Sequence, residues 1–502
     1  MTPSAGECRI ALRFLVHLSI TLMAVGSNRD AGGGGCPVTA SGKSGTADDP
    51  SASAIVYAVG DLHGDAACAR QWIIQTGLIN GLGRGDDGSD WEWNENAAGA
   101  NSSLVFVGDY VDKGPTSFQT VRFVKALTDR FPDRVVALMG NHELELLRDR
   151  DEDEAGERWR PPNSGGGFHR LAYATVHPGE YLNYVDVNPD GTDELVVEAL
   201  YNASAEVYGL GHQKYARMAP PPSFPIESSG ALPGEMMKYY YDNYGYVPIT
   251  EYVARADLRP LVSERLALYQ TAYIAAYRSG TGFGDWLRRR PAAHLSDDGT
   301  LFVHGGMNGE ILDQILRLSS SEEGEEEGEG VVPKESSVRH GVDELNRLLL
   351  TNSLEADLGS FLDFTPEGRA IDEIVTYRKN HPDPHFGGDR ACDRLQSLLD
   401  RTGGAIRRLA VGHTPGGSVR VHCNGILLAI DSTLGRWIRA SGNDYCPRIS
   451  LAVSTEGLPS QRRRHGPRSS NGQYQCPEVG EICEGQIVRL GHNGDVEIIR
   501  GA

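Results

Sequence analysis

The chain has 502 residues, which exceeds the usual size of one compact core and predicts several folded units or one large core with tails and insertions. Its composition, with 39% hydrophobic and 23% charged residues, is that of an ordinary globular protein. The formal net charge of −20 argues against nucleic acid as a partner and against a general affinity for anionic membranes, since both attract a basic face.

The N-terminus is typical of a secretory signal. Arg9 and Arg13 precede a mostly apolar stretch from Phe14 to Val25, which ends in small residues where a signal peptidase would cut. The stretch is shorter than the ~20 apolar residues that a membrane-spanning helix needs. We therefore predict a signal peptide at 1–26, a secreted or lumenal protein of the secretory pathway, and no stable membrane span once the signal is cleaved. A membrane-anchored or organellar protein is the alternative.

Composition divides the rest of the chain into regions. Gly, Ser, Ala and Asp dominate residues 27–53 without apolar periodicity, which predicts a disordered linker. The run of glutamates at 322–329 is typical of a solvated insertion. The predicted domains are a catalytic domain at 54–440, with insertions at about 151–262 and 319–335, and a Cys-containing polar C-terminal tail at 441–502.

Short apolar runs predict three buried strands in the first part of the catalytic domain. They are Ile55 to Val59, Leu104 to Val107 and Val135 to Met139, and each is followed by a glycine that opens a polar motif. Helical spacing predicts helices at Ala66 to Thr76 and Phe118 to Phe131 between them. This β-α-β-α-β order places the polar motifs at the carboxyl ends of strands, which is the edge where α/β sheets bind their ligands.

The first insertion contains a triple proline and the tyrosines Tyr239 to Tyr241, which belong to the core or to a substrate groove. No pattern in its sequence indicates its function. After it, a helix is expected from Leu261 to Arg278, and strands resume at Leu301 to Val303, Leu409 to Val411 and Ile426 to Ile430.

The cysteines bear on both the compartment and the chemistry. Cys446, Cys476 and Cys483 lie in the polar tail, where a disulfide would stabilise a segment with little core in an oxidising compartment, although the pairing is not readable. Cys68 and Cys392 are excluded as thiol nucleophiles, because neither begins a Cys-x5-Arg loop that would cradle a phosphate.

Three polar motifs follow the first three predicted strands. Asp61 and His63 lie in Gly-Asp-Leu-His-Gly-Asp, and Asp109 lies in Gly-Asp-Tyr-Val-Asp-Lys-Gly-Pro. Asn141 and His142 form the centre of Gly-Asn-His-Glu. Two further histidines that stand just beyond later apolar strands are His304 and His413.

This combination of side chains is what a pair of divalent cations requires. Two cations about 3.5–4 Å apart need a bridging carboxylate, with oxygen and imidazole ligands on either side, to clamp an in-line displacement at phosphorus. Asp109 is the natural bridge. A single His or Asp at a strand end is more often structural, but the joint occurrence of these motifs in this order favours a metal site.

The motifs together resemble those of the calcineurin-like metallophosphoesterases, in the phosphoprotein phosphatase branch, over roughly residues 54 to 440. The resemblance is closest to the Shewanella-like protein phosphatases, and it rests on Ile374-Val375-Thr376-Tyr377-Arg378, Cys392-Asp393-Arg394-Leu395, Gly412-His413-Thr414 and Ile430-Asp431-Ser432. It implies an α/β fold, the four-layer α/β/β/α sandwich of the calcineurin-like metallophosphoesterases, with two central mixed sheets.

The resemblance also implies a set of metal ligands. Asp61 and His63 would bind the first of two divalent metal ions, and Asp109 would bridge the two. The ligands of the second ion would be Asn141, His304 and His413. Oxygen and imidazole ligands suit manganese, iron or zinc, and we expect manganese to support activity in vitro.

Five residues would act on the substrate, again by resemblance. His142 would protonate the leaving oxygen as general acid, and Asp112 would hold its imidazole in the protonated state. Asn141, Lys113 and Arg378 would bind the substrate phosphate. Lys113 departs from the family pattern, which usually has arginine here, and lysine keeps the positive charge but loses bidentate geometry.

Two further acidic residues, Asp431 and Glu143, stand beside these motifs. The sequence leaves open whether they support the metal ligands or are purely structural. Gly305 and Gly306 are expected to let the backbone pass close to the metal ions.

The leading interpretation is a metal-dependent phosphoprotein phosphatase that hydrolyses phosphomonoesters by attack of a hydroxide bridging the two metal ions. Its partner would be a phosphoprotein or phosphopeptide, and neither the preferred phosphoresidue nor the oligomeric state is readable. The same core serves many substrates, so a nucleotide or another small phosphoester is the alternative. A non-catalytic binding module is disfavoured because all six predicted ligand positions and His142 are filled.

Overall fold

The computed structural model describes residues 55–82, 88–96, 101–154, 176–210, 216–217, 247–319, 334–354, 358–441, 480, 482–491 and 494–501. Several sequence predictions concern residues outside these ranges, namely the signal peptide at 1–26, the linker at 27–53, the tyrosines at 239–241 and the acidic run at 322–329.

The first of two five-stranded sheets contains the beginning of the catalytic domain. Its strands are β1 (Ile55–Val59), β4 (Ser102–Phe106), β5 (Val135–Ala137), β13 (Gln486–Leu490) and β14 (Val496–Arg500), in the order β14-β13-β1-β4-β5. β4 pairs in parallel with both β1 and β5, whereas β13 pairs antiparallel with both β1 and β14. The carboxyl ends of β1, β4 and β5 therefore meet at one edge of this sheet.

The second sheet is built in the same way from later residues. Its strands are β8 (Ala293–Leu295), β9 (Thr300–Val303), β10 (Arg408–Val411), β11 (Arg420–His422) and β12 (Leu427–Ala429), in the order β11-β12-β10-β9-β8. The three inner strands are parallel and the outer two are antiparallel to their neighbours. Both sheets are mixed, as predicted.

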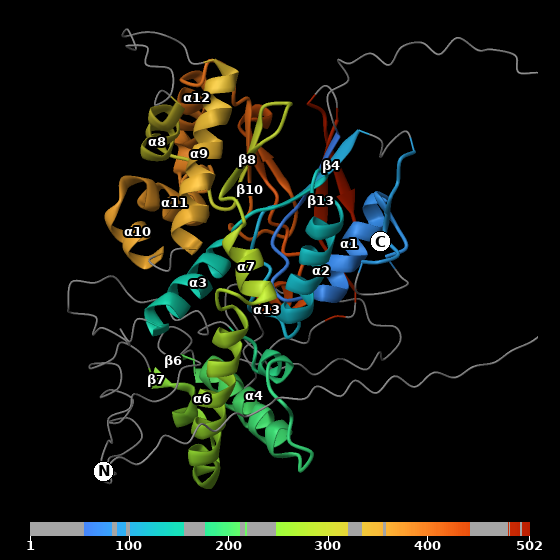
Figure 1. Ribbon diagram of the computed structural model, residues 1–502, viewed down its shortest axis with the longest axis vertical. Coiled ribbons are helices and arrows are strands. Elements are labelled where there is room, and N and C mark those ends of the chain that lie inside the picture. The colour runs from blue at the N-terminus through green and yellow to red at the C-terminus, as the bar shows by residue number, and fades with distance from the viewer. Residues whose placement is uncertain are drawn as a thin grey trace, which may run out of the picture. The chain divides into compact units, whose positions relative to one another are not determined.

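Side-chain alternation along the strands packs the two sheets face to face. In β1, Val56 and Ala58 lie in a core shared with the second sheet, whereas Tyr57 lies in the larger core on the opposite face. The shared core includes Phe302 and Leu428 of the second sheet. Figure 1 shows the strands of both sheets between two groups of helices, so the predicted four-layer α/β/β/α sandwich is confirmed.

Helices cover the outer faces. Those beside the first sheet are α1 (Ala66–Thr76) and α2 (Ser117–Arg130), and those beside the second are α8 (Gly309–Ser319), α9 (Glu335–Leu354), α11 (Pro366–Thr376) and α12 (Ala391–Asp400) (Figure 1). α1 illustrates how the sequence sets helix ends. The Asp65 side chain caps its N-terminus by accepting from the Cys68 N–H, and Gly77 ends it in a left-handed conformation with φ of 67°.

A separate group of helices, here called the helical region (the described residues within 176–277), contains the predicted first insertion as far as it is described, apart from residues 151–154 at the end of α3 (Asn141–Glu154). Its elements are η2 (Pro178–Asn183), α4 (Thr192–Leu210), η3 (Ile249–Tyr252), η4 (Ala256–Leu258) and α6 (Arg259–Ala276). α4 packs against α6, η2 packs against α2, and α6 packs against α3. The helical region therefore touches two helices that begin beside the polar motifs.

The remaining elements are short: β2 (Ile79–Asn80), β3 (Glu92–Trp93), β6 (Ala216–Arg217), β7 (Val247–Pro248), α7 (Gly282–Arg288), α10 (Leu358–Phe364), η5 (Gly388–Arg390), η6 (Cys423–Gly425) and α13 (Arg436–Ser441). The strands and helices predicted from apolar spacing are all present, with ends that differ by one or two residues. Within the described ranges, none of the helices combines the length and apolarity needed to cross a bilayer.

The prediction of a polar C-terminal tail at 441–502 is wrong for its last residues. β13 and β14 complete the first sheet, and Ile487, Val488 and Leu490 are buried. A disulfide between Cys68 of α1 and Cys483 attaches this hairpin to the start of the domain. The catalytic domain therefore extends beyond residue 440, because a strand that pairs with β1 can bury its apolar side chains on both faces of the sheet.

Candidate metal centre

The predicted ligands converge because parallel strands end at the same edge of each sheet. Asp61 and His63 follow β1, Asp109 follows β4, and Asn141 begins α3 shortly after β5. On the second sheet, His304 follows β9 and His413 lies two residues beyond β10. Since the two sheets pack face to face, their motifs meet, and every one of these side chains except the partly buried His413 is buried.

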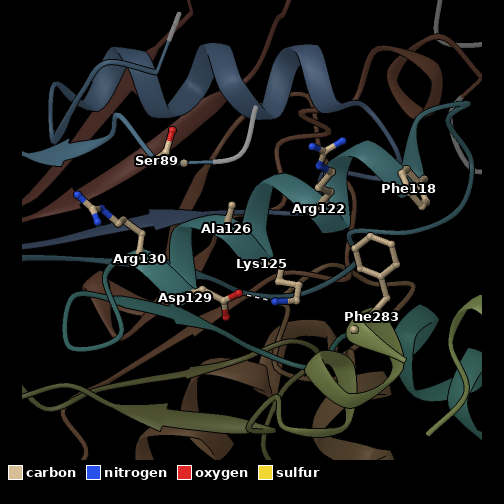
Figure 2. Close-up of a pocket in the computed structure, with 10 residues that line it drawn as sticks. Ser89, Phe118, Arg122, Lys125, Ala126, Asp129, Arg130 and Phe283 are labelled. Atoms are coloured by element: carbon tan, nitrogen blue, oxygen red, sulfur yellow. Dashed lines mark hydrogen bonds and ion pairs between the residues drawn. The ribbon is translucent and has the colours of Figure 1, made fainter. Parts of the chain in front are cut away.

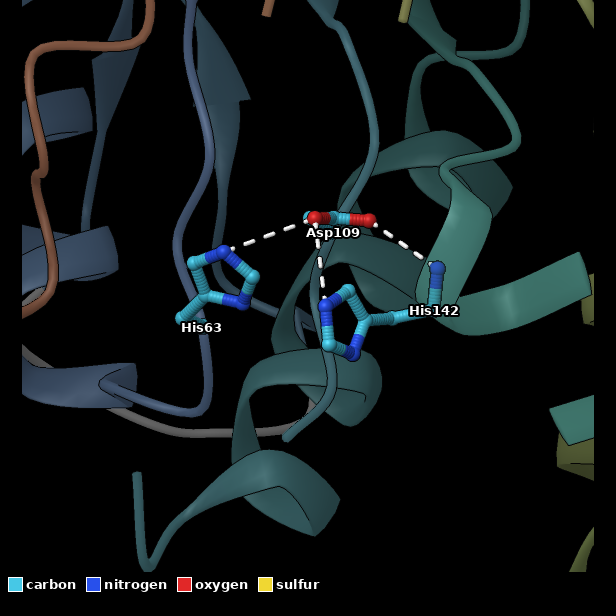
Figure 3. Close-up of side chains that lie close together, drawn as sticks. All are labelled: His63, Asp109 and His142. Atoms are coloured by element: carbon cyan, nitrogen blue, oxygen red, sulfur yellow. Dashed lines mark hydrogen bonds and ion pairs between the residues drawn. The ribbon is translucent and has the colours of Figure 1, made fainter. Parts of the chain in front are cut away.

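Asp109 lies at the centre of this group, with its two carboxylate oxygens facing different partners. Its Oδ1 is 3.2 Å from Nε2 of His304, while its Oδ2 is 3.4 Å from Nε2 of His63 and 3.8 Å from Nε2 of His142. Figure 3 shows the rings of His63 and His142 directed at one oxygen of this carboxylate, with the backbone N–H of His142 at the other. A carboxylate that presents one oxygen to each of two ligand sets has the geometry of a bridge.

The imidazoles are oriented by the backbone. His304 Nδ1 donates to the Val107 carbonyl oxygen at 2.8 Å, and His63 Nδ1 lies 3.3 Å from the Val111 carbonyl oxygen. Each ring therefore turns its Nε2 towards Asp109. Oδ1 of Asn141 lies 3.0 Å from Nε2 of His304, so amide and carboxylate oxygens converge on the same nitrogen. A ring fixed through Nδ1 with its Nε2 among oxygen atoms is the usual arrangement of a metal-binding histidine.

Asp61 connects the two sheets. Its Oδ1 and Oδ2 accept from the backbone N–H of His413 at 3.3 and 3.1 Å. This contact needs glycine at 412, because a Cβ there would lie 2.4 Å from Oδ1 of Asp61. At Gly305 a Cβ would lie 2.7 Å from the backbone nitrogens of Thr376 and Tyr377, so glycine there lets the backbone pass close to the end of α11. The approach of Gly305 and Gly306 to the metal ions stays a prediction.

Glu143 is the support of the Asp109 loop, which settles one question that the sequence left open. Its carboxylate accepts from the backbone N–H groups of Asp109, Tyr110 and Val111 at 2.8, 2.7 and 3.1 Å, and also from that of Gly140 at 3.0 Å. Asp109 has a φ of 56°, a left-handed conformation that these bonds hold in place. Burial, helped by the Asp109 charge, raises the pKa of Glu143 to about 7.

His142 and Asp112 form the predicted pair. Nδ1 of His142 donates to Oδ2 of Asp112 at 2.6 Å, which leaves Nε2 facing the cluster. Burial lowers the pKa of His142, but the Asp109 charge and the hydrogen bond to Asp112 outweigh it, and the pKa is raised overall. The His142 side chain retains 11% exposure, so the ring is not sealed from solvent.

Two cationic side chains face the same carboxylates. Nζ of Lys113 is 3.0 Å from Nε2 of His63, so an ammonium occupies a place next to a predicted ligand atom. Burial lowers the pKa of Arg378, and the charges of Asp61, Asp109 and Asp431 oppose this shift.

The donor set fits divalent cations. Two groups have ligand atoms that all lie within 4.8 Å of one another, His63 with Asp109 and His142, and Asp109 with His304 and His413, and the two share Asp109. Asp431 is buried beside them, and among the described residues its Oδ2 accepts no hydrogen bond. Burying several carboxylates together is costly unless cations compensate their charge.

The electrostatics of Asp61, His63 and His413 agree with a metal site. At His304, by contrast, burial lowers the pKa, but the charges of Asp109 and Asp61 outweigh burial and raise the pKa to about 9. Burial raises the pKa of Asp61, and the Asp431 charge raises it further. Burial lowers the pKa of His63, and burial with the His304 charge lowers that of His413 to about 2, so both imidazoles are neutral. Neutral imidazole is the form that binds metal ions.

Every residue that the sequence predicted for the site lies in or beside this cluster, and the sequence missed several that support it. The charged pair between Asp65 and Arg436 joins the first motif to α13, with Nε of Arg436 2.8 Å from Oδ2 of Asp65. Glu180 and Tyr273 of the helical region reach the Asp112 loop. Asp65 is the last residue of the first motif, but no role was predicted for it. No motif marks Arg436, Glu180 or Tyr273, because each contact joins residues far apart in the sequence.

A cavity of about 700 Å³ lies elsewhere, along α2. Residues of α2, α7 and the segment before β3 line it, including Phe118, Arg122, Lys125 and Phe283 (Figure 2). None of the predicted ligands or substrate-binding residues is among those that line it. The cavity is therefore lined by other residues than those of the cluster.

A family model described as calcineurin-like phosphoesterase matches residues 55–214. The matched segment begins at β1 and contains Asp61, His63, Asp109, Asn141 and His142. The predicted resemblance to the calcineurin-like metallophosphoesterases is confirmed by this match.

Curated relatives match parts of the chain. An uncharacterized protein of Schizosaccharomyces pombe is 26% identical over 190 residues, which cover 37% of this chain and 50% of the relative. A symmetrical bis(5'-nucleosyl)-tetraphosphatase of Aromatoleum aromaticum is 34% identical over 93 residues, covering 18% of this chain and 26% of the relative. The matches thus span half or less of the relatives' length.

Among solved structures, a cold-active protein tyrosine phosphatase is 14% identical with a TM-score of 0.41, and the match covers 89% of this chain and 78% of the other. A cold-active protein-tyrosine phosphatase of a psychrophilic Shewanella species is 16% identical, with a TM-score of 0.38, and the match covers 89% and 80%. A protein serine/threonine phosphatase of Saccharomyces cerevisiae is 11% identical, with a TM-score of 0.33, and the match covers 90% and 81%.

Proposed function

Because the chain carries a calcineurin-like phosphoesterase domain, we propose that it is a metal-dependent phosphoprotein phosphatase, a hydrolase that releases phosphate from phosphomonoesters on proteins. The observation that carries the proposal is the position of Asp109, whose two oxygens face two sets of ligands, beside a histidine held by a carboxylate. Phosphoester hydrolysis by this chemistry requires a positioned general acid, cationic side chains that bind phosphate, and a site for two metal ions.

Six residues would hold the two divalent ions. Asp61, His63 and Asp109 would bind one ion, and Asp109 would also serve the other. The remaining ligands of the second ion would be Asn141, His304 and His413. When bound, two such ions supply a water whose pKa is lowered towards neutrality and neutralise charge on the phosphoryl oxygens.

The acid side of the reaction follows from His142 and Asp112. As water attacks phosphorus, the bond from phosphorus to the ester oxygen breaks, and that oxygen leaves with the electron pair. His142 donates the proton that the leaving oxygen needs, and Asp112 stabilises the imidazolium before transfer. The 2.6 Å bond to Asp112 fixes the ring so that Nε2 carries the transferred proton.

Three residues would bind the phosphate of the substrate. Lys113 and Arg378 supply positive charge beside the carboxylates, and Asn141 presents its side-chain amide beside His304. The guanidinium of Arg378 suits a tetrahedral oxyanion because its N–H groups form a planar fork. Lys113 contributes charge without that geometry.

We also propose that the protein resides in the secretory pathway. Two disulfides, Cys68 with Cys483 and Cys392 with Cys423, support this proposal, because disulfides persist mainly in oxidising compartments. Both also remove Cys68 and Cys392 from consideration as nucleophiles.

The test is hydrolysis of phosphotyrosine and phosphothreonine peptides by the purified protein, after chelation and with manganese added back. Manganese-dependent phosphate release from either peptide is the expected result, and the ratio of the two rates gives the residue preference. A rate unchanged by chelation would contradict a metal-dependent mechanism.

A nucleotide substrate is the second candidate, favoured by the match to the bis(5'-nucleosyl)-tetraphosphatase. The same assay with a dinucleoside tetraphosphate separates the two. If the protein hydrolysed the dinucleotide but released no phosphate from either peptide, the substrate would be a small phosphoester instead of a phosphoprotein. The proposed metal centre would be unchanged.

A further inference from the structure

Asp112 receives hydrogen bonds from two directions. Its Oδ2 accepts from Nδ1 of His142 at 2.6 Å, and its Oδ1 accepts from the hydroxyl of Tyr273 at 3.4 Å. Tyr273 belongs to α6 of the helical region, and its side chain is fully buried. The carboxylate that orients the predicted general acid is therefore itself in contact with a residue outside the motifs.

The Tyr273 hydroxyl is a fixed donor. Burial raises the pKa of Tyr273 well above its ordinary value, and the Asp112 charge raises it further, so the phenol keeps its proton. The ring packs edge-to-face against Tyr181 and Tyr184, with centroids 6.0 and 5.1 Å away. These contacts hold the ring from both sides and direct its hydroxyl towards Asp112.

The backbone of Asp112 is held from the same region through Glu180 of η2. The Asp112 N–H donates to Oγ of Ser117 at 3.0 Å, at the start of α2. The side-chain oxygens of Glu180 in turn accept from the N–H groups of Ser117 and Phe118 at 2.7 and 2.8 Å. A buried carboxyl group that accepts from the first N–H groups of a helix fixes its first turn, and here that turn carries the contact to Asp112.

The alternative is that these tyrosines form only an apolar core. Tyr277 provides the contrast, since it lies one turn further along the chain and is equally buried, but its hydroxyl meets the hydroxyl of Tyr184 at 3.0 Å. Of these two matched phenols, Tyr273 is the one in contact with Asp112.

We propose that Tyr273 is a positioning residue for the general acid: through Asp112 it holds the His142 ring in the orientation from which the leaving oxygen is protonated. This inference rests on the proposed function. The helical region then determines how well the enzyme expels leaving groups that need a proton, such as the phenolate of tyrosine or the alkoxide of serine and threonine.

The leaving group provides the readout. p-Nitrophenolate departs readily without a proton, because p-nitrophenol is a much stronger acid than phenol. A defect in acid catalysis therefore slows phenyl phosphate hydrolysis more than p-nitrophenyl phosphate hydrolysis. A defect in folding, metal binding or phosphate binding slows both alike.

Tyr273→Phe removes one hydroxyl and keeps the ring. We expect kcat with phenyl phosphate to fall about tenfold, the usual effect of losing a hydrogen bond to a charged group, and kcat with p-nitrophenyl phosphate to fall less than about threefold. Tyr277→Phe is the matched control and should leave the ratio of the two rates unchanged. Equal losses on the two substrates, or no loss on either, would overturn the proposal.

A measurement that needs no turnover separates this inference from the proposed function. The ring N–H of His142 that donates to Asp112 should give a downfield proton NMR signal, identified by its loss in His142→Asn. In Tyr273→Phe the signal should broaden as exchange with water becomes faster, whereas an unchanged signal would refute the positioning role. If the wild-type protein hydrolysed neither the aryl phosphates nor the phosphopeptides, the proposed function would fail, and this signal alone would decide the inference.

Discussion

The two sides of the candidate centre are built differently. On the metal side, Asp61, Asp109 and His304 stand on strand ends, and their positions follow from the pairing of parallel strands within two sheets that share a core. On the acid side, Asp112 is held by single hydrogen bonds from helices, including one from Tyr273. The first arrangement is fixed by the sandwich, and the second depends on a few contacts.

This difference has a consequence for function. A change on the metal side affects ligands that face each other through Asp109, so it should disturb both ions together. A change on the acid side should leave the ions in place and alter only proton transfer. The two sides can therefore be perturbed separately.

The largest effect is expected for Asp109→Asn. Losing the shared carboxylate removes a ligand from both groups, so we expect both metal ions to be lost and turnover to fall by more than the ~10²–10⁴-fold typical of a missing general acid. Elemental analysis of the dialysed variant, together with peptide hydrolysis, measures both. Retention of two ions by this variant would show that Asp109 does not bridge.

His142→Ala is the corresponding change on the acid side. Turnover should fall roughly 10²–10⁴-fold while metal content stays near that of the wild type. A variant that lost a metal ion would instead identify His142 as a ligand, a role that its place in the group with His63 and Asp109 also allows. Unchanged turnover would remove it from acid catalysis.

The helical region should leave a signature in the pH dependence of stability. Burial raises the pKa of Glu180 from 4.5 to about 8. The folded state therefore holds the Glu180 proton more tightly than the unfolded state. This proton's contribution to the free energy of unfolding is complete below about pH 4.5 and is lost as the pH rises towards 8.

Glu180→Gln should remove this pH-dependent loss of stability. In the wild type it amounts to a decrease in the free energy of unfolding of at most about 1.4 kcal/mol per pH unit. Urea denaturation of chelated protein between about pH 5 and pH 8 measures it. Glu206→Gln, at an exposed position of α4, is the control and should keep the wild-type slope. An unaltered slope in Glu180→Gln would mean that Glu180 is ionised in the folded protein.

The smallest effect is expected at Lys113, which lies beside His63 on the metal side. Lys113→Arg should tighten phosphate binding roughly threefold, because a guanidinium can bind two oxygens at once. The product inhibition constant for inorganic phosphate measures this, and Lys125→Arg, in the cavity of Figure 2, is the control. Weaker inhibition by phosphate would count against a phosphate-binding role for Lys113.

The sequence located the residues of the metal side because the information that marks them is local. Each ligand stands within a few residues of an apolar strand, so apolar runs and polar motifs together located Asp61, Asp109 and His413. On the acid side, the sequence located Asp112 and His142, which lie in motifs, but not Glu180 or Tyr273, which do not. Nothing in Pro178–Asn183 indicates that Glu180 caps α2, since that contact joins residues 62 and 63 positions apart.

The C-terminal hairpin was missed for a different reason. β13 and β14 each contain apolar residues, and the glycine-containing segment 491–495 separates them, which is a hairpin pattern. The polar composition of the preceding residues obscured this pattern. Pairing of β13 with β1 then depended on a contact across more than four hundred residues, of the kind that the Cys68–Cys483 disulfide also makes.

The central claim is a two-ion centre that drives phosphoester hydrolysis. The most direct test titrates manganese into chelated wild-type protein while recording both bound metal and phosphate release from phosphotyrosine and phosphothreonine peptides. We predict two ions bound per chain, with release that depends on both. Release that persists without metal, or binding of a single ion at full activity, would contradict the account.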